Sequence, residues 1–175
     1  GGRDWYLPSM GELWLIRNHL EEIQTASSAV GGQRSVFTWD GFAPCFWSST
    51  ERDVWSAWVL NFGFRGIPDF WYDKVGKSFN VLPISKFQPS ELKESFTRKI
   101  SRKNNDELIS KADTAFVPDG VYILHETLGV RTVDGWNPKD NEGVTGILLV
   151  EDEHKIVVAL EDSPENLTWS EKRGL

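Results

Sequence analysis

The chain has 175 residues, of which 39% are hydrophobic and 26% charged, a profile typical of a globular domain rather than a disordered or membrane-spanning one. Its net charge of −7 argues against a general nucleic-acid binder, which needs a basic face, and against binding to anionic membrane surfaces. The single cysteine, Cys45, excludes an internal disulfide and a multi-cysteine zinc site, and its apolar neighbours favour a small buried residue over a reactive thiol.

The ends of the chain carry little information about its compartment. No apolar run approaches the roughly 18 residues that span a bilayer, so no membrane insertion is expected of this chain. No basic-then-apolar signal sequence opens it, and Gly1-Gly2 runs almost directly into patterned sequence. This is consistent with an N-terminus that was removed or that lies further upstream.

Aromatic residues dominate the first of three blocks, residues 1–87. Ser9 is expected to cap a helix, and Glu12 three residues later completes a capping box. Apolar residues then recur at helical spacing, which predicts an amphipathic helix over about 10–25: Leu13, Ile16, Leu20 and Ile23. The block holds seven of the nine tryptophans: Trp5, Trp14, Trp39, Trp47, Trp55, Trp58 and Trp71.

Two strands are predicted later in this block. The first has one strongly aromatic face, made by alternate residues: Trp58, Leu60, Phe62 and Phe64. The second, weaker prediction covers Ser78 to Ile84, where Pro83 indicates a sheet edge or an exit from the sheet.

The second block, residues 88–113, mixes charges and has no Trp or Gly. Leu92, Phe96 and Ile100 recur every four residues, which predicts a charged linker helix that docks weakly. The basic cluster at 98–103 is interpreted as a solvated face.

The third block, residues 114–175, is rich in predicted strands. Gly120 to Leu124 begins one strand, and the apolar runs Val144–Val150 and Lys155–Leu160 predict a hairpin around an acidic turn. Trp169 is expected to close over the core.

Three motifs in the first block together resemble a known family. They are Leu7-Pro8-Ser9 before the helix, the stretch Trp47-Ser48-Ser49-Thr50-Glu51, and the aromatic strand that reaches Phe62-Gly63. Their order and spacing resemble C-type-lectin-like domains that are common in surface proteins of Bacteroidetes, are often labelled as a domain of unknown function, and are similar to the major paralogous domain of Fibrobacter succinogenes. The resemblance implies an α+β fold with a twisted, mostly antiparallel sheet, one main helix and long loops. It also implies an extracellular or cell-surface location.

The order of the blocks departs from that family. In relatives, a strand block like Gly120–Asp162 comes before the Leu-Pro-Ser helix, whereas here it follows. The chain is therefore either a circular permutation of one domain, or two half-repeats joined by the linker. In C-type-lectin-like folds the two termini lie side by side in one sheet, so a linker could join them. The closing strand also differs, because Val81–Ser85 stands where relatives have an Arg-containing strand.

Ser48, Ser49 and Thr50 invite a nucleophile hypothesis, but no Gly-x-Ser-x-Gly elbow surrounds them. We interpret these hydroxyls as partners of local backbone groups where the chain leaves a strand. A formylglycine-generating enzyme shares the implied fold and remains a distant alternative. Its oxidase activity depends on active-site cysteines and copper, which Cys45 alone does not supply, so no enzyme activity is expected.

No metal or other cofactor is expected. The lectin motifs Glu-Pro-Asn and Trp-Asn-Asp are absent as such, and the three histidines share no zinc-ligand spacing. Four aspartates are candidates for a calcium site, although surface carboxylates are the default interpretation: Asp69, Asp73, Asp134 and Asp140.

The aromatic segment from Trp55 to Tyr72 is the best binding candidate, because its rings cannot all fit one side of one strand. Exposed aromatic rings beside polar side chains suit stacking on sugar rings or anchoring of a protein partner. The alternative is that these rings fill the core, as is expected of Trp47. The candidate ligand-binding residues are Trp55, Trp58, Phe64, Arg65, Asp69, Trp71, Tyr72 and Asp73.

The expected function is therefore that of an adhesin-like recognition module for a glycan or a surface protein. The rival hypothesis is a structural repeat or pilus-like module that forms oligomers through a sheet edge or swapped strands.

Overall fold

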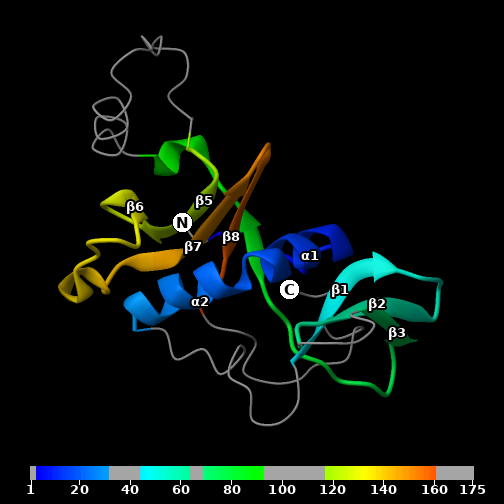
Figure 1. The fold of residues 1–175 in the computed structure, drawn as a ribbon. Coiled ribbons are helices and arrows are strands. Elements are labelled where there is room, and N and C mark those ends of the chain that lie inside the picture. Colours follow the sequence, from blue (N-terminus) through cyan, green and yellow to red (C-terminus); the bar gives the residue numbers. More distant parts are fainter. Residues whose placement is uncertain (1–2, 32–43, 64–68, 93–116, 161–175) are drawn as a thin grey trace.

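The computed structural model describes residues 3–31, 44–63, 69–92 and 117–160, and these form a mixed α+β architecture (Figure 1). Two α-helices accompany two antiparallel sheets, one of three strands in the order β1-β2-β3 and one of five in the order β4-β8-β7-β5-β6. The helices are α1 (Met10–Asn18) and α2 (Leu20–Ala29). The strands are β1 (Cys45–Glu51), β2 (Ser56–Asn61), β3 (Asp69–Asp73), β4 (Ile84–Lys86), β5 (Gly120–His125), β6 (Gly129–Thr132), β7 (Val144–Glu151) and β8 (His154–Val158).

The helical segment begins as predicted but does not continue as predicted. Ser9 caps α1 and forms the full capping box with Glu12. The single helix predicted over 10–25 is wrong, because the helix breaks at His19 (φ −105°, ψ 23°) and resumes as α2, which reaches Ala29. Helix α1 packs on β1 and β2, whereas α2 packs on β5 and β7 (Figure 1).

The five-stranded sheet contains the strands predicted in the third block. Both strands of the predicted hairpin are confirmed, and Asp152 takes the positive φ of 52° in its two-residue turn. The short strand β6 was not predicted. Alternate residues of β7 enter two different clusters of buried side chains, Ile147 and Leu149 on the helix side, Leu148 and Val150 on the other. Burial on both faces explains why this strand reads as a continuous apolar run.

Strand β4 joins the end of the first block to the third block. It pairs with β8 through Ile84–Val158 at one edge of the five-stranded sheet, and Tyr6 bridges its other side. The strand predicted over Ser78–Ile84 is wrong, because the regular strand begins only at Ile84, after Pro83. The linker helix predicted over 88–113 lies mainly outside the described residues, as does Trp169. Its beginning is described, and there residues 89–91 form a 3-10 helix.

The three-stranded sheet also has two different faces. Phe46 and Leu60 pack into the main core beneath the helices. On the opposite face, a smaller cluster forms around Trp47, which is fully buried as predicted. Its aromatic contacts run from Trp47 through Phe79 to Tyr72, with ring centroids 5.0 and 4.8 Å apart.

Candidate ligand-binding site

The large hydrophobic side chains that the described residues expose all lie on or beside the three-stranded sheet. Trp55 is 77% exposed and Trp71 is 49% exposed. Phe70, Val54 and Val75 complete this set. Phe70 faces the opposite side of β3 from Trp71, so the candidate site lies among the other exposed side chains, because clustered exposed apolar groups are typical of binding sites.

Trp55 is carried by a well-ordered turn between β1 and β2. The Asp53 carboxylate accepts hydrogen bonds from the backbone N–H groups of Trp55 and Ser56, at 2.8 and 2.7 Å. The Arg52 N–H closes the turn by donating to the Ser56 carbonyl at 3.0 Å. Hydrogen bonding from Ser56 and Trp55 holds the pKa of Asp53 below its usual value, so the carboxylate stays ionised while it organises the turn.

A buried lysine supports the same turn from the end of β3. Lys74 is only 7% exposed, and its ammonium donates to the carbonyls of Asp53 and Val54 at 3.1 and 3.3 Å. It also forms an ion pair with Glu51 at 3.2 Å. The Lys74 backbone N–H donates to the Trp55 carbonyl at 2.9 Å. Both the main chain and the side chain of this residue therefore hold the turn.

Trp71 lies in β3 directly opposite Trp58 of β2. Because successive strand residues point to opposite faces, Trp58 and Trp71 lie on the same face of the sheet as Leu60, which packs into the main core beneath the helices. Trp58 is half-buried, whereas Trp71 remains exposed. The guanidinium of Arg52 lies over the Trp71 ring at 3.6 Å from its centroid, which links the turn to this face by a cation–π contact.

The predicted site residues thus divide between surface and core. Asp73 is exposed at the end of β3, while Tyr72 is half-buried against Phe79 on the opposite face. Phe64, Arg65 and the Asp69 side chain lie outside what the structure describes.

The residues that sequence reasoning missed are Glu51, Arg52, Asp53 and Val54. They directly follow the Trp-Ser-Ser-Thr motif, and only the hairpin fold brings them to Trp71 and Lys74. Asp53, two residues before Trp55, was the one signal of a side-chain-capped turn in the sequence.

The hydroxyl-rich motif has a structural role, as expected, but it lies within β1 rather than where the chain leaves a strand, and two of its bonds reach distant segments. The Ser48 hydroxyl donates to the Trp58 carbonyl at 2.9 Å and accepts from the Thr50 N–H at 3.2 Å. The Thr50 hydroxyl accepts from the Met10 N–H at 3.0 Å, at the start of α1. These bonds join β1, β2 and the helix start.

The buried histidine His125 is also held by backbone groups. Its Nδ1 accepts from the N–H groups of Thr127 and Leu128, both at 3.1 Å, and its Nε2 lies 2.9 Å from the Glu142 carbonyl. An Nδ1 that accepts and an Nε2 that donates define the neutral Nε2–H tautomer. This ring fixes the β5–β6 turn.

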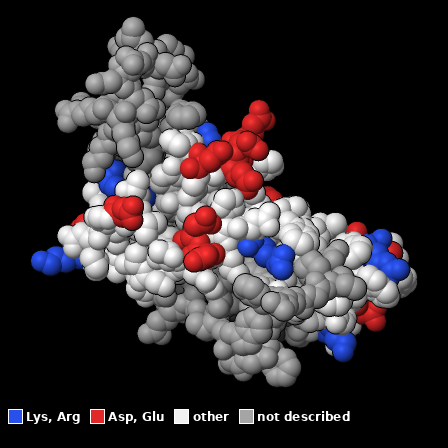
Figure 2. Space-filling model, viewed as in Figure 1, with Lys and Arg blue, Asp and Glu red and all other residues white. Residues whose placement is uncertain are grey.

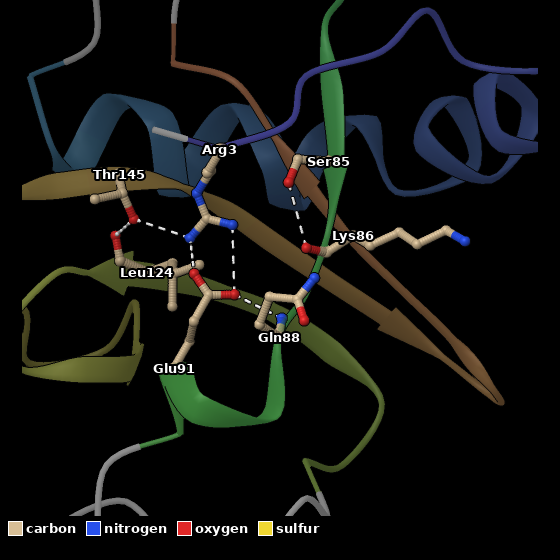
Figure 3. Close-up of polar contacts among 7 residues, drawn as sticks. All are labelled: Arg3, Ser85, Lys86, Gln88, Glu91, Leu124 and Thr145. Carbon is tan, nitrogen blue, oxygen red and sulfur yellow. Dashed lines mark hydrogen bonds and ion pairs between the residues drawn. The ribbon is translucent and has the colours of Figure 1, made fainter. Parts of the chain in front are cut away.

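The residues of a second polar cluster, beside the five-stranded sheet, bind one another (Figure 3). The guanidinium of Arg3 donates to the Glu91 carboxylate and to the Thr145 hydroxyl, the latter at 3.3 Å. Thr145 donates to the Leu124 carbonyl at 3.3 Å, and Glu91 accepts from the Gln88 N–H at 2.6 Å. The cluster ties together the N-terminal segment, residues 88–91, β5 and β7, which is a structural role.

Charge is distributed differently over the two sheets. Figure 2 shows acidic side chains gathered at the tip of the β7–β8 hairpin, where Glu151, Asp152 and Glu153 lie, and both signs of charge at the far end of the three-stranded sheet. Among the residues that the structure describes, no three His, Cys, Asp or Glu side chains gather so that they could hold a metal ion. Within the same residues, no helix has the length and apolar character needed to cross a membrane.

Comparison with known proteins gives no match: no family model, no curated protein and no solved structure is similar to this chain.

Proposed function

We propose that this chain is a recognition module with a C-type-lectin-like fold, and that it binds a carbohydrate through the β1–β2 turn and the adjacent face of β3. The proposed setting is the cell surface or the extracellular space. The observation that carries the proposal is Trp55, an indole that is 77% exposed on a turn held by Asp53 and Lys74.

Two features support the fold assignment. The helices follow Leu7-Pro8-Ser9, and the capping box at Ser9 sets their start. Strand β4, from the first block, lies beside β8, from the third, in one sheet. The two blocks therefore complete one sheet within the same chain, although β4 and β5, the strands on either side of the linker, are separated in that sheet by β8 and β7.

The chemistry of the site supports a neutral sugar. An indole offers a large flat apolar surface, on which the C–H face of a sugar ring can stack. Arg52 supplies hydrogen-bond donors for hydroxyl groups and Asp73 supplies acceptors. Glu51 is paired with Lys74, so the site presents no unpaired excess of positive charge that would select an anion.

A titration with neutral oligosaccharides tests this proposal. Isothermal calorimetry with cellohexaose, xylohexaose and mannohexaose should detect binding to at least one of them. Trp55→Ala should weaken that binding at least about tenfold, because an aromatic anchor commonly contributes 1–2 kcal/mol or more. Phe70→Ala is the matched control, since Phe70 is an exposed ring on the opposite face of β3 from Trp71 and should leave affinity unchanged.

A protein ligand or a neighbouring subunit is the second candidate function. Val54 and Val75 are about as exposed as Trp55 and lie at the same end of the sheet, and aliphatic side chains suit a protein contact better than a sugar. Light scattering over a range of concentrations separates the two candidates. A structural module should self-associate and lose this property in Val75→Ser, whereas a sugar-binding monomer should bind its oligosaccharide equally well with that substitution, because Val75 lies outside the β1–β2 turn.

A further inference from the structure

Lys74 is a buried lysine, and its charged ammonium group lies largely out of contact with water. Lysine is among the residues least often fully buried, because removing an ammonium from water carries a large desolvation cost. Here the side chain is 9% exposed and reaches three acceptors at 3.1 to 3.3 Å. An ammonium has three N–H donors, so this environment matches its donor count.

These three acceptors belong to one short stretch of chain. They are the Glu51 carboxylate and the carbonyls of Asp53 and Val54. These residues lead directly into Trp55, and they include the neighbours of Arg52 on both sides. The ammonium therefore binds the buried side of the turn, and the exposed side of the same turn carries Trp55 and Arg52.

Stability alone is a poor explanation for this arrangement. A well-packed apolar residue often stabilises a protein as much as a buried ion pair does, and without the desolvation cost. An apolar side chain cannot bind two carbonyls and a carboxylate, however, and so cannot fix the path of the turn. The ordered turn is what the lysine adds, and a preordered loop loses less conformational entropy when it binds a ligand.

We propose that Lys74 is a positioning residue: its ammonium organises the turn at residues 51–55 from within and fixes the placement of Trp55 and Arg52. The use of this placement for ligand binding rests on the function proposed above, but the ordering of the turn does not. Lys74 itself contacts no ligand in this proposal, because it lies beneath the turn.

Amide hydrogen exchange of the ligand-free full chain, measured by NMR, tests the ordering. In Lys74→Met, the Glu51 carboxylate and the carbonyls of Asp53 and Val54 lose the ammonium that they share. The Asp53 side chain is then held less firmly against the amides of Trp55 and Ser56, so both amides should exchange at least about tenfold faster. The amides of Ile123 and Leu148 in the five-stranded sheet should stay within about twofold of wild type. Lys77→Met is the matched control, because Lys77 is exposed three residues further on and should change none of these rates.

Glu51→Gln keeps the protein testable even if Lys74→Met fails to fold. This substitution retains both carbonyl contacts and removes only the charge of one acceptor, so the two turn amides should accelerate by about threefold. Unchanged turn amides in a folded Lys74→Met, or in Glu51→Gln where Lys74→Met is unfolded, overturn the proposal. Equal acceleration in both sheets of a folded Lys74→Met also overturns it, because the lysine would then be merely stabilising.

Calorimetry with the same three oligosaccharides separates this inference from the proposed function. Affinity should fall about tenfold in Lys74→Met and remain unchanged in Lys77→Met. If wild type binds none of the sugars while the turn amides behave as expected, the sugar-binding function fails and the positioning role of Lys74 stands. If a sugar binds but neither exchange nor affinity responds to Lys74→Met, the positioning role fails and the function stands.

Discussion

The two sheets of this protein differ in how completely they bury their apolar side chains. The five-stranded sheet is covered on both faces, and its central strand β7 sends alternate residues into two separate clusters of buried side chains. The three-stranded sheet buries Trp47 on one face and Leu60 on the other, yet Trp55, Phe70 and Trp71 remain exposed on or beside it. In the described part of the chain, no comparably large hydrophobic side chain is exposed on the five-stranded sheet.

Two ion pairs, Arg3–Glu91 and Lys74–Glu51, show the same division of roles. Arg3 and Glu91 bind each other, and Arg3 also binds Thr145 of β7, which in turn binds Leu124 of β5, so the cluster joins distant segments of the scaffold (Figure 3). Lys74 and Glu51 instead act within the three-stranded sheet, where they join the end of β1 to the residue after β3 beside the exposed rings. One charged pair thus joins distant parts of the scaffold, whereas the other orders a turn at an exposed surface. The surroundings of each pair determine its role.

Two tryptophans of the three-stranded sheet should give the largest contrast in stability. Trp47→Ala removes a fully buried indole and should lower the free energy of unfolding by about 3–5 kcal/mol. Trp55→Ala removes an exposed one and should change it by no more than about 0.5 kcal/mol. Urea unfolding followed by far-UV circular dichroism measures both without relying on tryptophan fluorescence. Similar losses for the two variants would mean that Trp55 packs against the protein, and its role as a ligand platform would have to be abandoned.

A smaller effect is expected from adding one methyl group to the centre of the five-stranded sheet. A Cβ at Gly146 would lie 2.5 Å from Val157 Cγ1 and 2.9 Å from the Val158 carbonyl oxygen. Gly146→Ala should therefore lower the free energy of unfolding by about 1–3 kcal/mol, because the β7–β8 pair must shift to accept it.

Gly11→Ala is the control for this change. Gly11 lies within α1, where a Cβ meets only the Ser9 hydroxyl at 3.9 Å, and alanine there should be neutral or stabilising by up to about 1 kcal/mol. A Gly146→Ala variant as stable as wild type would show that the five-stranded sheet is less tightly packed than its two buried faces indicate.

Local patterns were sufficient to predict much of the five-stranded sheet. The apolar run from Val144 and the acidic turn after Val150 correspond directly to β7 and its hairpin, because burial on both faces leaves a signal in every residue. The break at His19 left no such signal. Interrupting a helix for one residue keeps its apolar stripe in phase, and Ile16 and Ile23 remain buried on either side.

The candidate site was predictable only in part. Sequence identified Trp55 and Trp71 as candidates, but their exposure depends on which rings the fold covers, and periodicity does not carry this information. Arg52 reaches Trp71 only because β1, β2 and β3 are adjacent in one sheet. Lys74 was visible as a charge among aromatic residues, while its burial follows from the hairpin that closes over it.

The smallest expected effect is a change in proton binding at Tyr6, where the two sheets meet. Tyr6 bridges Ile84 at the edge of the five-stranded sheet, and its hydroxyl donates to the Glu12 carboxylate of α1 at 2.9 Å. Burial, together with the hydrogen bond and the charge of Glu12, raises the pKa of Tyr6 to about 12.

Because the folded state holds this proton more tightly than the unfolded chain, the stabilising contribution of Tyr6 is complete below about pH 10 and is lost as the pH rises through about 12. The absorbance difference between wild type and Tyr6→Phe at alkaline pH should therefore titrate with a midpoint near 12, and the stability advantage of wild type should shrink over the same interval. Tyr122 is the internal reference, since burial raises the pKa of its phenol as well but Glu12 is not its partner. A midpoint near 10 for the Tyr6 difference would mean that the phenol faces water, and the contact that links α1 to the five-stranded sheet would then be absent in solution.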